Sequence, residues 1–121
     1  MLDYLDFETS DDGEGTTTFD AMAYTAADRW PALKAEVERV LAWCTADLGP
    51  PGALAQGHRW DLDLQLQTDT GDALACHWDA PLHTLAAAHA ADGNALQLSL
   101  TISMEAPDAA AFEGQFLADA Q

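Results

Sequence analysis

Three carboxylates and one imidazole recur at alternate positions in two neighbouring stretches of this 121-residue sequence. Asp61 and Asp63 alternate with leucines, and His77 and Asp79 follow in a second alternating stretch. Because side chains two positions apart on a β-strand share a face, each stretch predicts a strand with one polar side. If the two strands pair, these four groups form one cluster. Such a cluster is suited to a divalent cation or to a basic partner, and otherwise it is a solvated sheet face.

The loop between the two stretches sets their register. Residues 69–71, Asp-Thr-Gly, fit a three-residue hairpin loop, which is a type I turn closed by a glycine in the left-handed region. A loop one residue shorter or longer would place Leu64 opposite His77 and so mix apolar with polar side chains. The predicted apolar pairs are Leu64 with Cys76 and Leu62 with Trp78, and the predicted polar pairs are Asp63 with His77 and Asp61 with Asp79.

A second group of acids, Asp11, Asp12 and Glu14, lies in a glycine-rich polar loop. A calcium-binding EF-hand loop needs Gly at its sixth position and Glu at its twelfth. Neither Gly13 nor Gly15, taken as the sixth position, brings a Glu to the twelfth. The sequence therefore predicts a solvated acidic tip that could contact a partner, and no calcium loop.

Other chemistries find little support in the sequence. The histidines and cysteines lack the short spacings of structural zinc sites, and no phosphate-binding glycine loop or G-x-S-x-G motif is present. Cys76 is expected to point into the core, where a thiol without a positive neighbour is inert. We therefore expect no catalytic residue, no metal site, no cofactor and two reduced cysteines, Cys44 and Cys76.

The element that organises the chain is a predicted helix over residues 28–48. Asp28 is expected to cap it, Pro31 suits its first turn, and Gly49 ends it. Trp43 lies at the flank of the apolar stripe, where a C-terminal helix is expected to cover it; if exposed, it would be a contact residue. The apolar stripe consists of Trp30, Leu33, Val37, Val40, Leu41, Cys44 and Leu48.

The remaining elements predict a single α+β domain over residues 1–121. Alternation and turn residues predict a largely antiparallel sheet of about five strands, with one face covered by the helix at 28–48 and by a C-terminal helix. Residues 81–91 favour a short helix, with a strand as the alternative. The strand at 95–104 could lie at an edge and pair with a second copy of the chain. The predicted strands are 2–8, 16–24, 58–67, 72–79 and 95–104, and the C-terminal helix is 107–120.

The net charge of −17 comes from 21 acidic residues against only four Lys and Arg. Such a field repels nucleic acid and anionic membranes, and it speeds encounters with basic proteins. No apolar run approaches the roughly 20 residues that span a bilayer. The acidic start of the sequence is unlike a targeting peptide, so we expect a cytoplasmic location.

The leading functional hypothesis is a non-enzymatic binding module for a basic protein, similar by charge alone to nuclease inhibitors and nucleic-acid mimics. One alternative is a small metal-dependent enzyme or cation site on the polar face of the central hairpin. Another is that the acidity serves only solubility. The residues expected to bind a partner are Asp61, Asp63, His77, Asp79, Asp11, Asp12 and Glu14.

Overall fold

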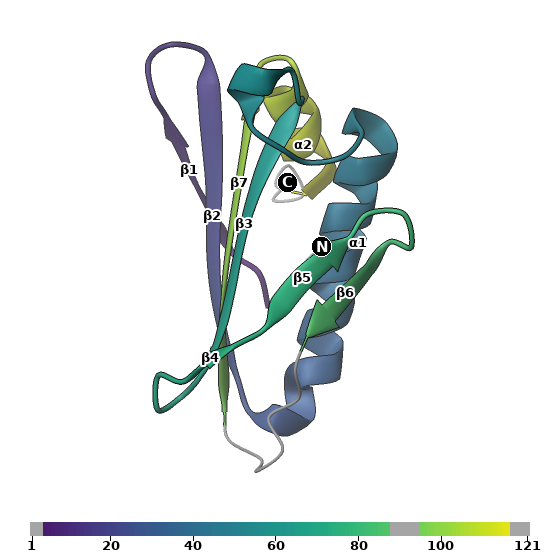
Figure 1. Ribbon diagram of the computed structural model, residues 1–121. Coiled ribbons are helices and arrows are strands. Elements are labelled where there is room, and N and C mark those ends of the chain that lie inside the picture. Colours follow the sequence, from purple (N-terminus) through teal and green to yellow (C-terminus); the bar gives the residue numbers. More distant parts are fainter. Residues whose placement is uncertain (1–3, 88–94, 117–121) are drawn as a thin grey trace.

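The computed structural model describes residues 4–87 and 95–116. In chain order its elements are β1 (Phe7–Asp11), β2 (Thr16–Thr25), η1 (Ala27–Arg29), α1 (Trp30–Leu48), η2 (Leu54–Gln56), β3 (Trp60–Thr68), β4 (Ala73–Leu74), β5 (Cys76–Asp79), β6 (Thr84–Ala87), β7 (Leu96–Glu105) and α2 (Asp108–Phe116). The large sheet has five strands in the order β1-β2-β7-β3-β4, all antiparallel, and β5 pairs separately with β6. Figure 1 shows α1, α2 and the β5–β6 hairpin on the same side of the large sheet. The predicted α+β architecture is confirmed.

The strand at the centre of the sheet is β7. It pairs with β2 along one side and with β3 along the other, from Leu96 to Met104 in both ladders. The prediction that this strand lies at an edge, with its Ser/Thr face free for a second copy, is therefore wrong. The physical reason is burial: its alternate side chains from Leu96 to Met104 are all buried, which a strand achieves best with a neighbour on each side.

The helix α1 packs the predicted stripe against the sheet. Leu33, Val37, Val40, Leu41 and Cys44 have no measurable exposure, so the stripe is confirmed. Each of these leucine and valine side chains contributes about 1.5–3 kcal/mol to the stability of the fold by leaving water. The proline in the first turn and the stop at the glycine after Leu48 are also as expected.

The predicted cap by Asp28 is wrong. The short helix η1 precedes α1, so the position that caps α1 is Arg29, and no side chain bonds the free N–H groups there.

The first strand also differs from its prediction. It begins at Phe7, because the backbone N–H groups of Tyr4 and Leu5 donate to the buried carboxylate of Glu36 on α1, at 3.0 and 3.1 Å, and not to a neighbouring strand.

An aromatic cluster centred on Phe112 closes one end of the core. Its ring centroid lies 4.5 Å from that of Phe19, 5.4 Å from Phe7 and 5.1 Å from Phe116. The ring of Trp43 packs edge-on against Phe112 and Phe116, at 6.1 and 5.7 Å. The expectation that the C-terminal helix covers Trp43 is therefore confirmed. Residues 117–120 of that predicted helix lie outside the described part of the chain.

The turn between β3 and β4 has the predicted form. The N–H of Gly71 donates to the carbonyl of Thr68 at 3.0 Å, the N–H of Thr68 donates to Asp72 at 2.9 Å, and Gly71 has φ of +93°. The pair Leu66↔Leu74 belongs to the predicted register. However, the ladder ends there, and β5 leaves β3 to pair with β6.

The departure of β5 follows from contacts with α1. Trp78 is only 5% exposed, and its indole N–H donates to the hydroxyl of Thr45 at 3.0 Å. On β6, Leu85 is buried and its N–H donates to the carboxylate of Glu38 at 2.8 Å. The four predicted cross-strand pairs are therefore wrong. The partners of Asp61 and Asp63 on β7 are Ser103 and Thr101, while those of His77 and Asp79 on β6 are Ala86 and Thr84.

The predicted helix at 81–91 is wrong where the structure describes it. Residues 84–87 form β6, the alternative that the sequence also allowed, and residues 88–91 lie outside the described chain. Alanine favours helix only weakly. Pairing with β5 instead buries Leu85 opposite Trp78, and this tertiary contact outweighs the local preference.

Glu38 links α1 to the hairpin and to a neighbouring lysine. Its partial burial alone would raise the pKa of its carboxyl. The N–H of Leu85 and the ammonium of Lys34, 2.9 Å away, outweigh burial and hold the pKa below its usual value of 4.5. The charged carboxylate of Glu38 therefore stabilises the fold fully at pH values above its ordinary pKa of 4.5. This stabilisation is lost as the pH falls through the lowered pKa of the folded protein.

We predict that Phe112→Ala lowers the free energy of unfolding by about 3–5 kcal/mol, because it empties the centre of the aromatic cluster. The control is Glu113→Ala, an exposed position on the same helix, which should change it by less than about 0.5 kcal/mol. Denaturant unfolding measures both. A loss below about 1 kcal/mol for Phe112→Ala would contradict this role of the cluster.

We also predict that Glu38→Gln is less stable than the natural protein at pH 7, and that the difference shrinks as the pH falls below 4.5. The amide oxygen of glutamine can still accept a hydrogen bond from Leu85, so the variant isolates the effect of the charge. Thermal unfolding across this pH range gives the comparison. A difference that stays constant, or grows on acidification, would be inconsistent with a lowered pKa.

Candidate functional site

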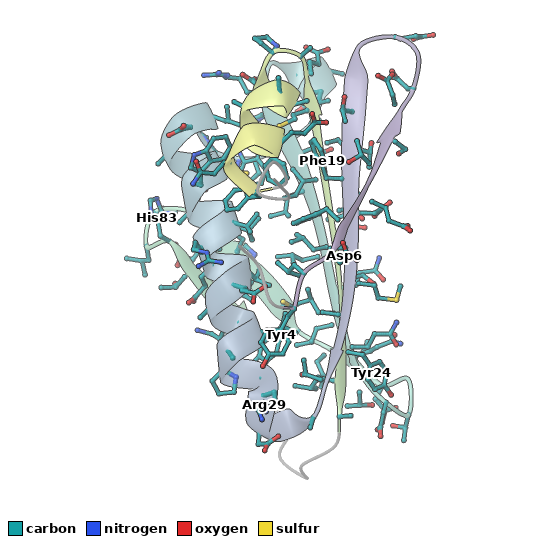
Figure 2. All side chains as sticks on the ribbon, turned by 180° about the vertical axis from the view of Figure 1, so that it is seen from behind. Tyr4, Asp6, Phe19, Tyr24, Arg29 and His83 are labelled. Carbon is teal, nitrogen blue, oxygen red and sulfur yellow. The ribbon has the colours of Figure 1, made fainter. Side chains whose placement is uncertain are left out.

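The side of the large sheet that faces away from the helices carries most of the strand-borne acids. We call this side the outer sheet face. Figure 2 shows Tyr24 on this side and Phe19 on the side of the helices. The register places Glu8 of β1, Asp20 of β2, Thr101 of β7 and Asp63 of β3 in one row across four strands. Asp61 lies in the next such row, opposite Ser103.

The spacing within this row decides which charges interact. Glu8 and Asp20 are direct cross-strand partners, so their Cβ atoms are about 5 Å apart and the two carboxylates repel. Asp20 and Asp63 are separated by Thr101, which makes them about 9–10 Å apart, close to the screening length in physiological salt. The pair Glu8–Asp20 therefore carries the strongest repulsion in the row.

Hydroxyl and amide donors satisfy parts of this face. The hydroxyl of Thr101 donates a hydrogen bond to Asp20, and the amide of Gln65 donates to Asp63 at 3.4 Å. Asp61 accepts the backbone N–H of Leu62 at 2.8 Å. These donors orient the carboxylates but bring no positive charge.

Two ion pairs between described residues lie away from this face. Lys34 pairs with Glu38 on α1 at 2.9 Å, and Arg59 pairs with Asp108 of α2 at 2.7 Å. Figure 2 shows Arg29 beside the start of α1, in the layer of the helices. Neither pair neutralises an acid of the outer sheet face.

A hollow of about 540 Å³ opens on this face next to β1 and β2. Its lining includes Asp6, Glu8, Asp20, Met22 and Ser99. Met22 is 63% exposed, and Tyr24, two residues further along the same strand, is 61% exposed. Large apolar side chains thus adjoin the carboxylates.

The structure distributes the seven sequence-predicted residues over three places. Asp61 and Asp63 lie on the outer sheet face. His77 is exposed and Asp79 half-buried on the β5–β6 hairpin, where the carboxylate of Asp79 accepts the N–H of Leu82 at 3.2 Å. The third place is the β1–β2 turn, which carries Asp11, Asp12 and Glu14.

At that turn, carboxylates hold the backbone in place. Asp11 accepts the N–H of Gly13 at 2.6 Å, and Asp12 accepts those of Glu14 and Thr16 at 2.7 and 3.0 Å. The hydrogen bond from the N–H of Glu14, with a smaller contribution from the N–H of Thr16, lowers the pKa of the Asp12 carboxyl. These acids are exposed, but two of them already have local partners.

Glu8 and Asp20 are members of the row that sequence reasoning missed. The signal was present in residues 16–24, where Phe19, Ala21 and Ala23 alternate with Asp20, Met22 and Tyr24. Since two of the first set are only alanines and the second set holds the large side chains Met22 and Tyr24, the buried side could not be assigned from the pattern alone. The structure buries the first set and exposes the second.

The residues proposed for a cation site are not assembled. Within 4–87 and 95–116, no group of three or more His, Cys, Asp or Glu side chains is arranged to hold a metal ion.

Burial, with a smaller contribution from Asp47, raises the pKa of the Cys44 thiol to about 12, and burial also raises the pKa of the Cys76 thiol. Both cysteines are free thiols in the structure.

Comparison of this chain with protein-family models, with curated proteins and with solved structures finds no match. Neither described helix is both long and apolar enough to cross a membrane.

We predict that Asp20→Asn raises the free energy of unfolding by up to about 1 kcal/mol at low salt, because it relieves the repulsion with Glu8. Asparagine still offers an oxygen to Thr101, so that hydrogen bond can persist. The gain should shrink at high salt, where screening weakens the repulsion. Denaturant unfolding at two ionic strengths tests this, with Asp69→Asn on the β3–β4 turn as control. A destabilised Asp20→Asn variant, or a gain that salt does not change, would contradict the prediction.

Proposed function

We propose that this protein is a non-enzymatic binding module whose outer sheet face docks against a basic protein. The observation that supports the proposal is the row of Glu8, Asp20 and Asp63, which crosses the sheet and contributes no acid to either of the ion pairs described above. Directly opposed carboxylates weaken a sheet, and a partner's lysines or arginines would remove that repulsion on binding.

The exposed Met22 and Tyr24 complete this surface. Met and Tyr are enriched in protein interfaces, and aromatic residues often provide much of the binding energy. Their position beside Asp20 favours a partner surface on which Lys or Arg residues surround an apolar patch. The charges would chiefly speed association and select the partner, while the apolar contacts slow dissociation.

The same charges argue against other partners. Nucleic acids and anionic membranes carry the same sign as this face and would be repelled. Self-association through the outer sheet face would oppose like charges and is disfavoured for the same reason. A cytoplasmic location and any oligomer formed through another surface stay predictions.

A binding role and a mere solubility trait differ in one testable respect, which is whether the position of the charge matters. We compare Asp20→Asn/Asp63→Asn with Asp69→Asn/Glu113→Gln, which removes the same number of exposed charges from other surfaces. Basic proteins captured from a cell extract at low salt are identified, and their association rates with each purified variant are then measured.

We predict that the outer-face variant lowers the association rate about tenfold at low salt and less at high salt, whereas the control variant has a small effect. Equal losses for both variants would show that only total charge matters. That result, or failure to capture any basic protein at low salt, would contradict the proposed function.

A further inference from the structure

The edge of β3 is open along part of its length. At its C-terminal end the strand pairs with β4, but only at Leu66 and Gln67 before β5 departs. At its N-terminal end, the carbonyl of Trp60 accepts the N–H of Gly52 at 3.0 Å. Between these two points, the described residues contribute no strand that pairs with this edge.

The direction of the backbone groups at this edge follows from parity. The carbonyl of Trp60 and the N–H of Thr68 both point away from β7, because they bond to Gly52 and Asp72. In a β-strand, residues of the same parity direct their N–H and C=O groups to the same side. Leu62 and Leu64 therefore present their backbone groups at the open edge.

A cleft of about 280 Å³ lies beside this edge. At this place β5 diverges from β3 (Figure 1). Its lining includes Leu62 and Leu64 from β3 and Cys76 and Trp78 from β5, together with Asp61 and His77. Leu62, Leu64 and Cys76 are only half-buried, although they face the covered side of the sheet. The cleft is thus apolar on the side of the core and acidic on the side of the outer sheet face.

We propose that this edge accepts a short extended segment of a basic partner as an added strand. Alternate side chains of an added strand continue the two faces of a sheet. Residues opposite Leu62 and Leu64 would enter the apolar cleft, while those opposite Asp61 and Asp63 would join the acidic outer sheet face. The segment that fits therefore alternates apolar with basic residues over about four positions.

The negative charge along the β3 edge favours a basic segment over a strand from a second copy of the chain. Another strand that ends the large sheet, β1, has the sequence Phe-Glu-Thr-Ser-Asp, and β3 itself carries Asp61 and Asp63. Pairing either strand with the β3 edge would bring further acids to an acidic edge, with no cation to offset them. A basic segment gives opposite-charge pairs instead. The inference rests on the proposed function for the sign of the partner, and it adds the mode of binding.

Asp61 occupies one of the backbone donors at this edge. Its carboxylate accepts the N–H of Leu62, one of the two donors that the open edge offers. A charged side chain folded over an edge is a known protection against uncontrolled strand pairing. The N–H of Leu64 is then the donor at this edge that a partner would meet first.

The test uses six-residue peptides that alternate lysine and valine. In antiparallel addition, which matches the rest of the sheet, the valines lie opposite Leu62 and Leu64 and direct their backbone groups at β3. N-methylation of the valines therefore removes donors from the pairing without changing charge, and N-methylation of the lysines is the matched control. We predict that valine methylation weakens binding about tenfold or more and that lysine methylation has a smaller effect. Hydrogen exchange should show slower exchange of the Leu64 amide with the unmethylated peptide.

The outcomes separate this inference from the proposed function. If all the peptides bind equally and Leu64 exchange does not change, binding is by charge alone, and strand addition is overturned while the proposed function stands. Strand addition is likewise overturned if no peptide binds but the position-dependent association with basic proteins persists. If that association is also absent, both proposals fail.

Discussion

The attachment of the β5–β6 hairpin to α1 decides where the β3–β4 ladder ends and which part of the β3 edge stays open. Trp78 packs into the core and donates to Thr45, while the N–H of Leu85 donates to Glu38. These contacts compete with continuation of the β3–β4 ladder, which could otherwise extend from Leu66↔Leu74 in the same register. Burial of an indole with its N–H satisfied, together with a charge-assisted hydrogen bond, outweighs the net gain from a few more backbone pairs. The departure of β5 from β3 leaves part of the β3 edge open and forms the cleft beside it.

The outer sheet face obeys a different constraint. Because alternate residues of a strand point to opposite faces, the residues between the buried ones lie on the outer sheet face. Neighbouring acids on that face repel each other, but their presence costs no packing in the core. Antiparallel pairing then brings together Glu8, Asp20 and Asp63, which are remote in sequence. Since repulsion between direct neighbours costs up to about 1 kcal/mol, a stable core can carry it, and a partner with the opposite charge can relieve it.

Local patterns in the sequence were sufficient for much of the fold. The apolar stripe of α1, the alternation in β3 and β7, and the Asp-Thr-Gly turn each reflect contacts within or next to one element. The separation of β5 from β3 could not be predicted because it depends on Thr45 and Glu38, far away in the chain. For the same reason alanine content suggested a helix where β6 forms. The acidic row required the strand order and the buried side of β2, and neither is encoded by a short-range pattern.

We propose that basic partners bind the outer sheet face and not the acidic surface as a whole. Mapping amide chemical shifts of the labelled protein during titration with an oligolysine peptide tests it most directly. We predict that the largest changes follow the row of Glu8, Asp20 and Asp63, and that Asp69 and Glu113 change little. Changes spread evenly over every exposed acid, including the β1–β2 turn and α2, would contradict it.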